Sequence, residues 1–138
     1  MPEATAGTLL RVASRRLGEA GIDTAGLDAR LLLQAVLGCD HAGLVAEPER
    51  LVTAAEAQAF GALVARRERH EPVSRILGWR EFYGRRFEIS PAVLDPRPDT
   101  ETLIDAALAV AKLRPVQRLA DLGTGSGIVA LTLLAEWP

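Results

Sequence analysis

The sequence has 138 residues, of which 49% are hydrophobic and 25% charged, and its net charge is −2. This length suits about one domain with a sizeable core, and the near-neutral charge argues against binding nucleic acid through overall charge, so we expect no direct nucleic-acid partner. The single cysteine, Cys39, excludes an internal disulfide, and the sequence has no Cys/His cluster for zinc. Its apolar runs fall far short of the ~18 residues of a membrane-spanning helix, and its first residues do not resemble a secretory signal, so we expect a cytoplasmic protein without a membrane partner.

Residues 1–72 predict a small bundle of three to four helices. Apolar residues recur at helical spacing over residues 9–20, 27–36 and 60–64. Gly21 and Gly38 follow the first two of these segments, where glycine commonly ends a helix. Thr53 and Glu56 have the spacing of a capping box at the start of the last long helix, and Pro72 closes it. Short connections between amphipathic helices indicate a helical bundle, so we assign residues 1–72 to a helical domain.

Residues 73–94 predict a connector that contains a β-hairpin. From Val73 onward, aromatic and β-branched residues alternate with glycines and charged residues, a pattern typical of strands. Trp79, Phe82 and Tyr83 allow two interpretations: a docking patch for a partner, or packing in the core of the hairpin, which we prefer.

Residues 95–138 predict the beginning of a Rossmann-like α/β domain. Residues 95–98 form a rigid connector, and Pro98 suits the first turn of a helix that continues to Ala111. We then expect a short buried strand at residues 118–122, a turn at residues 123–127 and a helix at residues 128–137.

Charge is distributed unevenly along the chain. Residues 66–86 carry seven basic and three acidic side chains, a net charge of +4, whereas residues 1–65 and 87–138 are each at −3. This basic segment would suit an acidic partner, but a solvent-exposed helix end and hairpin explain it equally well.

The strongest chemical feature is the glycine-rich turn at residues 121–127 (DLGTGSG). Glycines allow positive φ and let a ligand approach the backbone, and the following helix offers unpaired N–H groups to a carboxylate or phosphate. The third glycine stands one residue too early for a dinucleotide fingerprint, and the turn lacks the lysine of a P-loop. A structural turn that binds no ligand remains an alternative.

The pattern acid–x–Gly–x–Gly–x–Gly resembles motif I of class I S-adenosylmethionine-dependent methyltransferases. This resemblance implies that the turn packs against the methionyl part of the cofactor S-adenosylmethionine and that the acidic residue helps to hold its amino group. The cofactor-binding residues implied here are Asp121, Gly123, Thr124, Gly125, Ser126 and Gly127.

Residues 90–101 (SPAVLDPRPDTE) resemble the signature just before motif I in the release-factor glutamine methyltransferases, the HemK/PrmC family. Residues within the segment 66–82 are similar to the domain junction of this family, and residues 27–33 are similar to its N-terminal helical domain. Asp95 departs from the family, which usually has an aliphatic residue at this position. The resemblance therefore covers nearly the whole chain and implies that residues 95–138 begin a class I methyltransferase domain.

The resemblance implies an enzyme that transfers a methyl group to the glutamine amide nitrogen of the Gly-Gly-Gln motif in class 1 peptide-chain release factors, and so acts in translation termination. The helical domain would recognise the release factor. By the same analogy, Arg97 and Thr100 line the cofactor pocket, or else they only cap the helix that begins nearby.

The sequence contains no asparagine, so it lacks the Asn-Pro-Pro-Tyr motif that orients the amide in this family. We therefore assign no catalytic residue, and expect a fragment or a shortened gene product that is inactive alone. Two alternatives remain: a non-catalytic module that binds release factors, and a fragment of an adenine-N6 DNA methyltransferase.

Three further residues have structural interpretations. Cys39 is expected to be a small apolar filler rather than a nucleophile, because no His–acid partner is evident. His41 is expected in a loop and His70 at a helix end.

Overall fold

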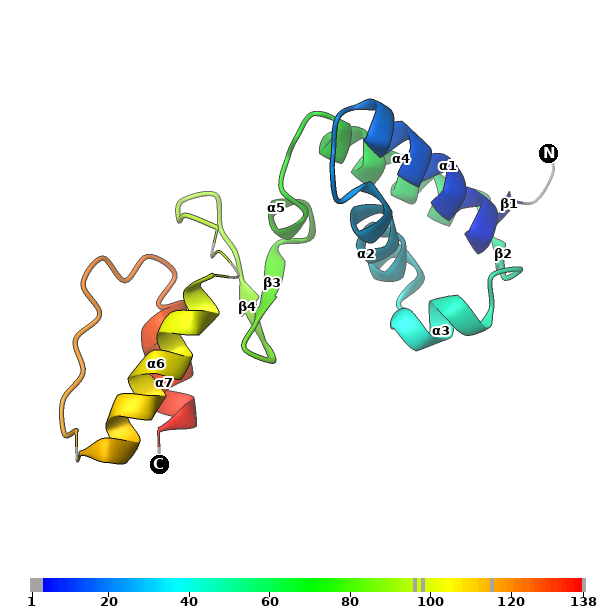
Figure 1. Ribbon diagram of the computed structural model, residues 1–138. Coiled ribbons are helices and arrows are strands. Elements are labelled where there is room, and N and C mark those ends of the chain that lie inside the picture. Colours follow the sequence, from blue (N-terminus) through cyan, green and yellow to red (C-terminus); the bar gives the residue numbers. More distant parts are fainter. Residues whose placement is uncertain (1–3, 96, 98, 115, 138) are drawn as a thin grey trace. The chain divides into compact units, whose positions relative to one another are not determined.

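The computed structural model describes residues 4–95, 97, 99–114 and 116–137 (Figure 1), so the predicted helix start at Pro98 lies outside the described residues. The chain divides into two compact units, Met1–Leu77 and Gly78–Pro138. We call them the helical unit and the C-terminal unit. The prediction of three functional domains at residues 1–72, 73–94 and 95–138 stays a prediction.

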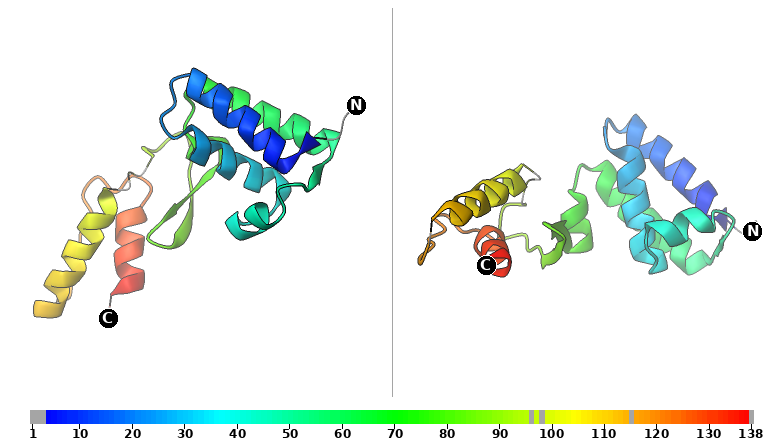
Figure 2. Two further views of the ribbon diagram at one scale, coloured as in Figure 1. Left: turned by 45° about the vertical axis from the view of Figure 1, so that its right-hand side comes forward. Right: turned by 60° about the horizontal axis from the view of Figure 1, so that its bottom comes forward.

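The helical unit contains α1 (Ala6–Glu19), α2 (Ala25–Leu37), α3 (His41–Ala46), α4 (Ala54–Glu68) and α5 (Val73–Leu77). Two short strands, β1 (Ala4–Thr5) and β2 (Leu51–Val52), pair antiparallel. Figures 1 and 2 show α1 and α4 lying side by side, and α2 packs against both. This arrangement confirms the predicted bundle.

Side chains cap three of these helices at their first turn. Thr5 accepts a hydrogen bond from the Thr8 N–H at 3.3 Å, and Asp40 accepts one from the Gly43 N–H at 2.8 Å. The predicted capping box is present, because Thr53 accepts from the Glu56 N–H and the Glu56 carboxylate accepts from the Thr53 N–H. Each cap satisfies backbone donors that would otherwise lack partners, so the caps fix where the helices begin.

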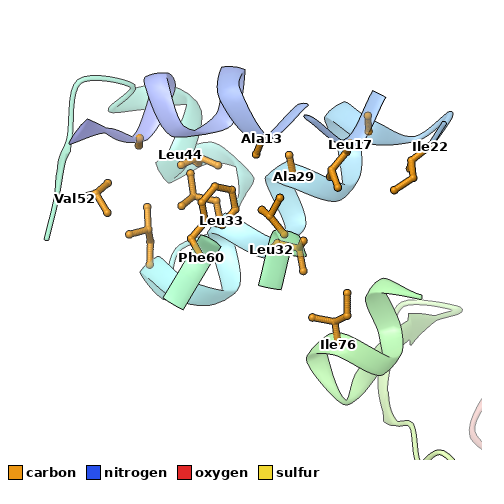
Figure 3. Close-up of a cluster of buried hydrophobic side chains, with 14 residues drawn as sticks. Ala13, Leu17, Ile22, Ala29, Leu32, Leu33, Leu44, Val52, Phe60 and Ile76 are labelled. Atoms are coloured by element: carbon orange, nitrogen blue, oxygen red, sulfur yellow. The ribbon is translucent and has the colours of Figure 1, made fainter. Parts of the chain in front are cut away.

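The core of the helical unit lies between α1, α2 and α4 (Figure 3). Leu17, Leu32 and Leu33 are fully buried there, and Phe60 and Val64 contribute the buried side chains of α4. Cys39 is partly buried and packs against this core, as expected for an apolar filler.

The structure corrects the predicted start of the hairpin. Residues 73–77, expected as part of the hairpin connector, form α5, and the buried side chain of Ile76 joins the core of the helical unit. The hairpin is confined to β3 (Trp79–Phe82) and β4 (Arg85–Glu88), which pair antiparallel. The prediction was wrong here because five residues are too few to show a helical period, and Val73 and Ile76 suit a strand as well as a buried helical turn.

The C-terminal unit packs this hairpin against α6 (Thr100–Leu113) and α7 (Ile128–Glu136), where the two last helices were predicted. Its small core is formed by Phe82, Ile104, Ile128 and Leu133. Phe82 is 1% exposed and meets Phe87 edge to face, and Tyr83 is half-buried beside this core. These contacts support the hairpin-core interpretation for Phe82 and Tyr83, whereas Trp79 is not part of this core among the described residues and instead lies against the guanidinium of Arg86.

The predicted buried strand at residues 118–122 does not form. Residues 116–121 have no regular structure, and the side chains of Leu119 and Leu122 are 40% and 93% exposed. A parallel strand is stable only beside neighbouring strands, and none pairs with these residues in the described part of the chain. The Rossmann-like start therefore remains a proposal.

Across the described residues, none of the helices is both long enough and apolar enough to span a membrane.

Candidate functional site

The glycine-rich turn has the backbone that the sequence predicts. Gly123, Gly125 and Gly127 have φ angles of 75°, 53° and 74°, which other residues rarely adopt. The Gly127 N–H donates to the Thr124 carbonyl at 2.8 Å, which closes the turn. The Leu131 N–H in turn donates to the Gly127 carbonyl at 2.9 Å, so α7 starts directly after the turn.

Asp121 stands at the entrance of the turn with a half-buried side chain. Its Oδ2 atom accepts a hydrogen bond from Thr124 Oγ1 at 3.2 Å. A carboxylate has two oxygens and about four acceptor sites, so this bond leaves capacity for an amino group. Thr124 thus orients Asp121, a role that the sequence did not predict.

The space beside the turn is open. A Cβ atom added to Gly123 would meet nothing within 4 Å, and one added to Gly125 would meet only the Gly123 carbonyl oxygen, at 3.9 Å. The side chains of Asp121 and Ser126 are half-buried, whereas that of Thr124 is exposed. A ligand could therefore lie directly against this backbone.

Arg97 and Thr100 lie at the start of α6. The Thr100 N–H donates to the Arg97 carbonyl at 3.0 Å, and Asp99 precedes the helix without a side-chain cap. The Arg97 side chain is exposed and that of Thr100 half-buried. Within the described residues, no hydrogen bond or ion pair joins Arg97 or Thr100 to the glycine-rich turn. The structure therefore does not connect these two residues to the rest of the candidate site.

The hairpin tip makes contacts that sequence reasoning missed. The Tyr83 N–H donates to Glu101 Oε1 at 2.8 Å, and the Tyr83 hydroxyl donates to Asp105 Oδ1 at 2.7 Å. The hydrogen bond to the Asp105 carboxylate raises the pKa of Tyr83, because it favours the protonated phenol. Arg85 forms an ion pair with Glu136 of α7 at 2.5 Å. The one available signal was the spacing of Glu101 and Asp105, which places both on one face of α6.

The basic segment, residues 66–86, is largely occupied by contacts inside each unit. Arg66 pairs with Glu71, and Arg67 pairs with the buried Asp28 at 2.8 Å. In the C-terminal unit, the guanidinium of Arg86 lies 4.3 Å from the centroid of the Trp79 ring. These contacts favour the interpretation of this segment as a helix end and a hairpin over that of a surface for an acidic partner, because several of its arginines already have partners within the protein.

Asp95, the one departure from the family signature, also has a partner. Its Oδ2 atom accepts from Arg80 Nη1 at 3.2 Å, whereas its buried Oδ1 atom has no hydrogen-bond partner.

The described residues contain no group of three or more His, Cys, Asp or Glu side chains that could hold a metal ion. A shallow hollow in the C-terminal unit is mostly apolar and is lined by Val116, Gln117, Arg118, Leu119, Leu134 and Trp137. It includes none of the glycine-turn residues.

Comparison with known proteins points to one family. A family model described as the PrmC N-terminal domain matches residues 8–78. A release factor glutamine methyltransferase of Bradyrhizobium diazoefficiens is 48% identical over 131 residues, which cover 93% of this chain and 44% of the relative. Proteins of the same name from Rhodospirillum rubrum and Cereibacter sphaeroides are also 48% identical, over 96% of this chain and 40% and 46% of their own lengths.

The chain thus spans less than half the length of each of these three relatives. The match to the family model covers nearly all of the helical unit and ends one residue beyond it, and the similarity to the relatives continues through the C-terminal unit. This chain therefore belongs to the HemK/PrmC family of release-factor glutamine methyltransferases, of which it represents the N-terminal part.

Proposed function

We propose that this chain is the N-terminal part of an S-adenosylmethionine-dependent methyltransferase that acts on the glutamine side-chain amide of the Gly-Gly-Gln motif in class 1 release factors. The observation that supports the cofactor best is the glycine-rich turn, with three positive-φ glycines, open space beside two of them and Asp121 at its entrance. The names of the relatives support the substrate.

The residues present fit the methionyl end of the cofactor. The exposed backbone of Gly123 and Gly125 would pack against the methionyl chain, and Asp121 would accept a hydrogen bond from its ammonium group. Arg97 and Thr100 would complete the pocket from the start of α6. When bound, the cofactor would supply an electrophilic methyl group for the amide nitrogen, while Asp121 and the turn backbone would hold its methionyl end.

We propose that the chain alone does not catalyse this transfer. The amide nitrogen is a poor nucleophile, so the reaction depends on groups that hold and orient it. The family does this with an Asn-Pro-Pro-Tyr motif, and the chain contains no asparagine. The helical unit would serve to recognise the release factor.

The cofactor proposal is tested by titrating the ¹⁵N-labelled chain with S-adenosylmethionine at millimolar concentration. We expect weak, saturable changes confined to the amide signals of residues 121–127, because much of a complete pocket is lacking. Gly125→Val should abolish them, since a β-branched side chain resists positive φ and fills the open space. Gly18→Val, at a helix position with open space around it, is the matched control and should bind as the wild type does.

A dissociation constant in the micromolar range for S-adenosylmethionine and the wild-type chain would contradict the view that the pocket is incomplete. Turn signals that do not change in the wild type, or that change equally in Gly125→Val, would contradict the cofactor proposal.

A second candidate function is a non-catalytic module that binds release factors. It is favoured by the separate core of the helical unit, which coincides with the matched PrmC N-terminal domain. Capture of a purified class 1 release factor by residues 1–77 would support it, and a Leu33→Asp variant with a disrupted core should lose that capture. The adenine-N6 DNA methyltransferase alternative gains no support from the names of the relatives.

A further inference from the structure

The tip of the β3–β4 hairpin has an unusual backbone. Tyr83 and Gly84 occupy its two central positions with φ angles of 51° and 69°, the pattern of a type I′ turn. Asparagine, aspartate or glycine usually takes the first of these positions, because other side chains are disfavoured at positive φ. A tyrosine here indicates that contacts of the side chain and of the N–H hold the tip in place.

Those contacts reach two helices. Tyr83 donates to Glu101 through its N–H and to Asp105 through its hydroxyl, both on α6. Arg85, two residues further on, pairs with Glu136 near the end of α7. Phe82, directly before Tyr83, is buried in the core that α6 and α7 share. The tip is thus fastened to both helices by charge-assisted hydrogen bonds around an apolar anchor.

The same two helices carry the two parts of the candidate site. Thr100 begins α6, one residue before Glu101, and the glycine-rich turn leads directly into α7. Between the helices, the described residues 116–121 have no regular structure. In this structure the spacing of α6 and α7 therefore depends on their own packing and on the hairpin tip that spans them.

We propose that Tyr83 is a positioning residue through which the hairpin tip fixes the start of α6 relative to the glycine-rich turn. Glu101 and Asp105 are the hydrogen-bond acceptors of Tyr83 on α6. The functional meaning of this role rests on the cofactor function proposed above. The Glu101 carboxylate accepts the Tyr83 N–H through its Oε1 atom, so Glu101 holds the hairpin tip against α6.

The test uses the 138-residue chain, labelled with ¹⁵N and free of cofactor, and follows the amide signals of Gly123, Gly125 and Gly127. Tyr83→Phe removes the hydroxyl that bonds Asp105 but keeps the ring and the N–H. Glu101→Ala removes the acceptor of that N–H, whereas Glu101→Gln retains an acceptor oxygen. Glu81→Gln is the matched control, because this exposed carboxylate on the same hairpin makes no hydrogen bond within the described residues.

We expect Tyr83→Phe and Glu101→Ala to shift the three glycine signals and to speed hydrogen exchange in the first turns of α6 by about tenfold or more, as loss of one charge-assisted hydrogen bond implies. Glu101→Gln should restore the wild-type spectrum, which a mere effect of charge near the helix end would not allow. Glycine signals that stay unchanged in both Tyr83→Phe and Glu101→Ala would overturn the proposal. Far-UV circular dichroism confirms that each variant is folded.

A second arm adds S-adenosylmethionine to the same samples. If the wild-type turn responds, Tyr83→Phe should weaken the response several-fold, and an equal response would contradict a positioning role at the cofactor site. If the wild-type turn does not respond, the cofactor function fails, and the spectra without cofactor still decide whether Tyr83 positions the turn.

Discussion

The most deeply buried ion pair of the helical unit joins Asp28 of α2 to Arg67 of α4. The side chains are 8% and 16% exposed, and Asp28 Oδ2 accepts both from Arg67 Nε and from Thr24 Oγ1 at 2.8 Å. Arg67 also donates to the Glu71 carbonyl. A buried charge is tolerated only when it is paired and hydrogen-bonded, and this pair meets both conditions.

Asp28→Ala should therefore lower the free energy of unfolding by about 3 kcal/mol, because it leaves the Arg67 guanidinium buried without its carboxylate. Arg16→Ala is the matched control: it breaks the more exposed pair with Glu68 and should cost about 1 kcal/mol or less. Urea denaturation of both variants gives the comparison. Equal losses for the two variants would mean that burial does not distinguish these ion pairs.

The stability of the helical unit should depend on two surface glutamates in acid. The hydrogen bond from Arg66 lowers the pKa of Glu71, and the hydrogen bonds from Thr53 lower the pKa of Glu56, from their usual 4.5. A carboxyl whose pKa is lowered on folding stabilises the native state above its unfolded pKa. This contribution disappears as the pH falls through the lower folded value.

Urea midpoints measured from neutral pH down to below 4.5 should therefore fall in the wild type and fall less in Glu71→Gln. Glu49→Gln, at an exposed position without a hydrogen bond among the described residues, should keep the wild-type profile. A Glu71→Gln profile identical to that of the wild type would contradict the assignment.

At the scale of elements, the sequence correctly predicted the features that depend only on residues close together in the chain, such as helix caps and turns. The spacing of Thr53 and Glu56 and the glycines at 123, 125 and 127 specify local backbone geometry, and the structure has that geometry. The strand at 118–122 depends on pairing with other strands, so its apolar sequence alone could not form it. The contacts from Tyr83 to Glu101 and Asp105 span 18 and 22 residues, and no local pattern announces them.

Hydrogen exchange should separate the elements of the C-terminal unit. The amides of residues 116–126 should exchange rapidly, because they lie outside regular structure, while those in the middle of α6 and α7 should be protected by their shared core. Mass spectrometry or NMR on a demonstrated monomer measures this. Protection of residues 119–122 equal to that of α6 would show that the segment pairs as a strand after all.

At the scale of the whole molecule, the two units differ in how well they cover their apolar surface. The helical unit buries a continuous core from α1 to α5. In the C-terminal unit, by contrast, large apolar side chains are exposed on α6, on α7 and between them: Leu103, Val110, Leu113, Leu119, Leu122, Leu131 and Leu134. Such surfaces favour association or aggregation, so we expect the C-terminal unit to limit the solubility of the chain.

A chain ending at residue 77 should fold independently. We expect far-UV circular dichroism minima typical of helices and one cooperative thermal transition, because the core and caps of α1–α4 lie within these residues. Ending the chain at residue 72 instead removes α5 with Ile76 and should lower the midpoint. A residue 1–77 fragment without helical minima would show that the helical unit needs the rest of the chain.

The pairing of the arginines between residues 66 and 86 bears on how fast a partner would be met. Arg66, Arg67, Arg80 and Arg85 each have a carboxylate neighbour, so their charge is compensated at short range. Long-range steering needs an uncompensated field that extends beyond the Debye length of about 8 Å at physiological ionic strength. The pairing of these four arginines should consequently reduce both the rate at which an acidic partner is attracted to this segment and the dependence of that rate on added salt.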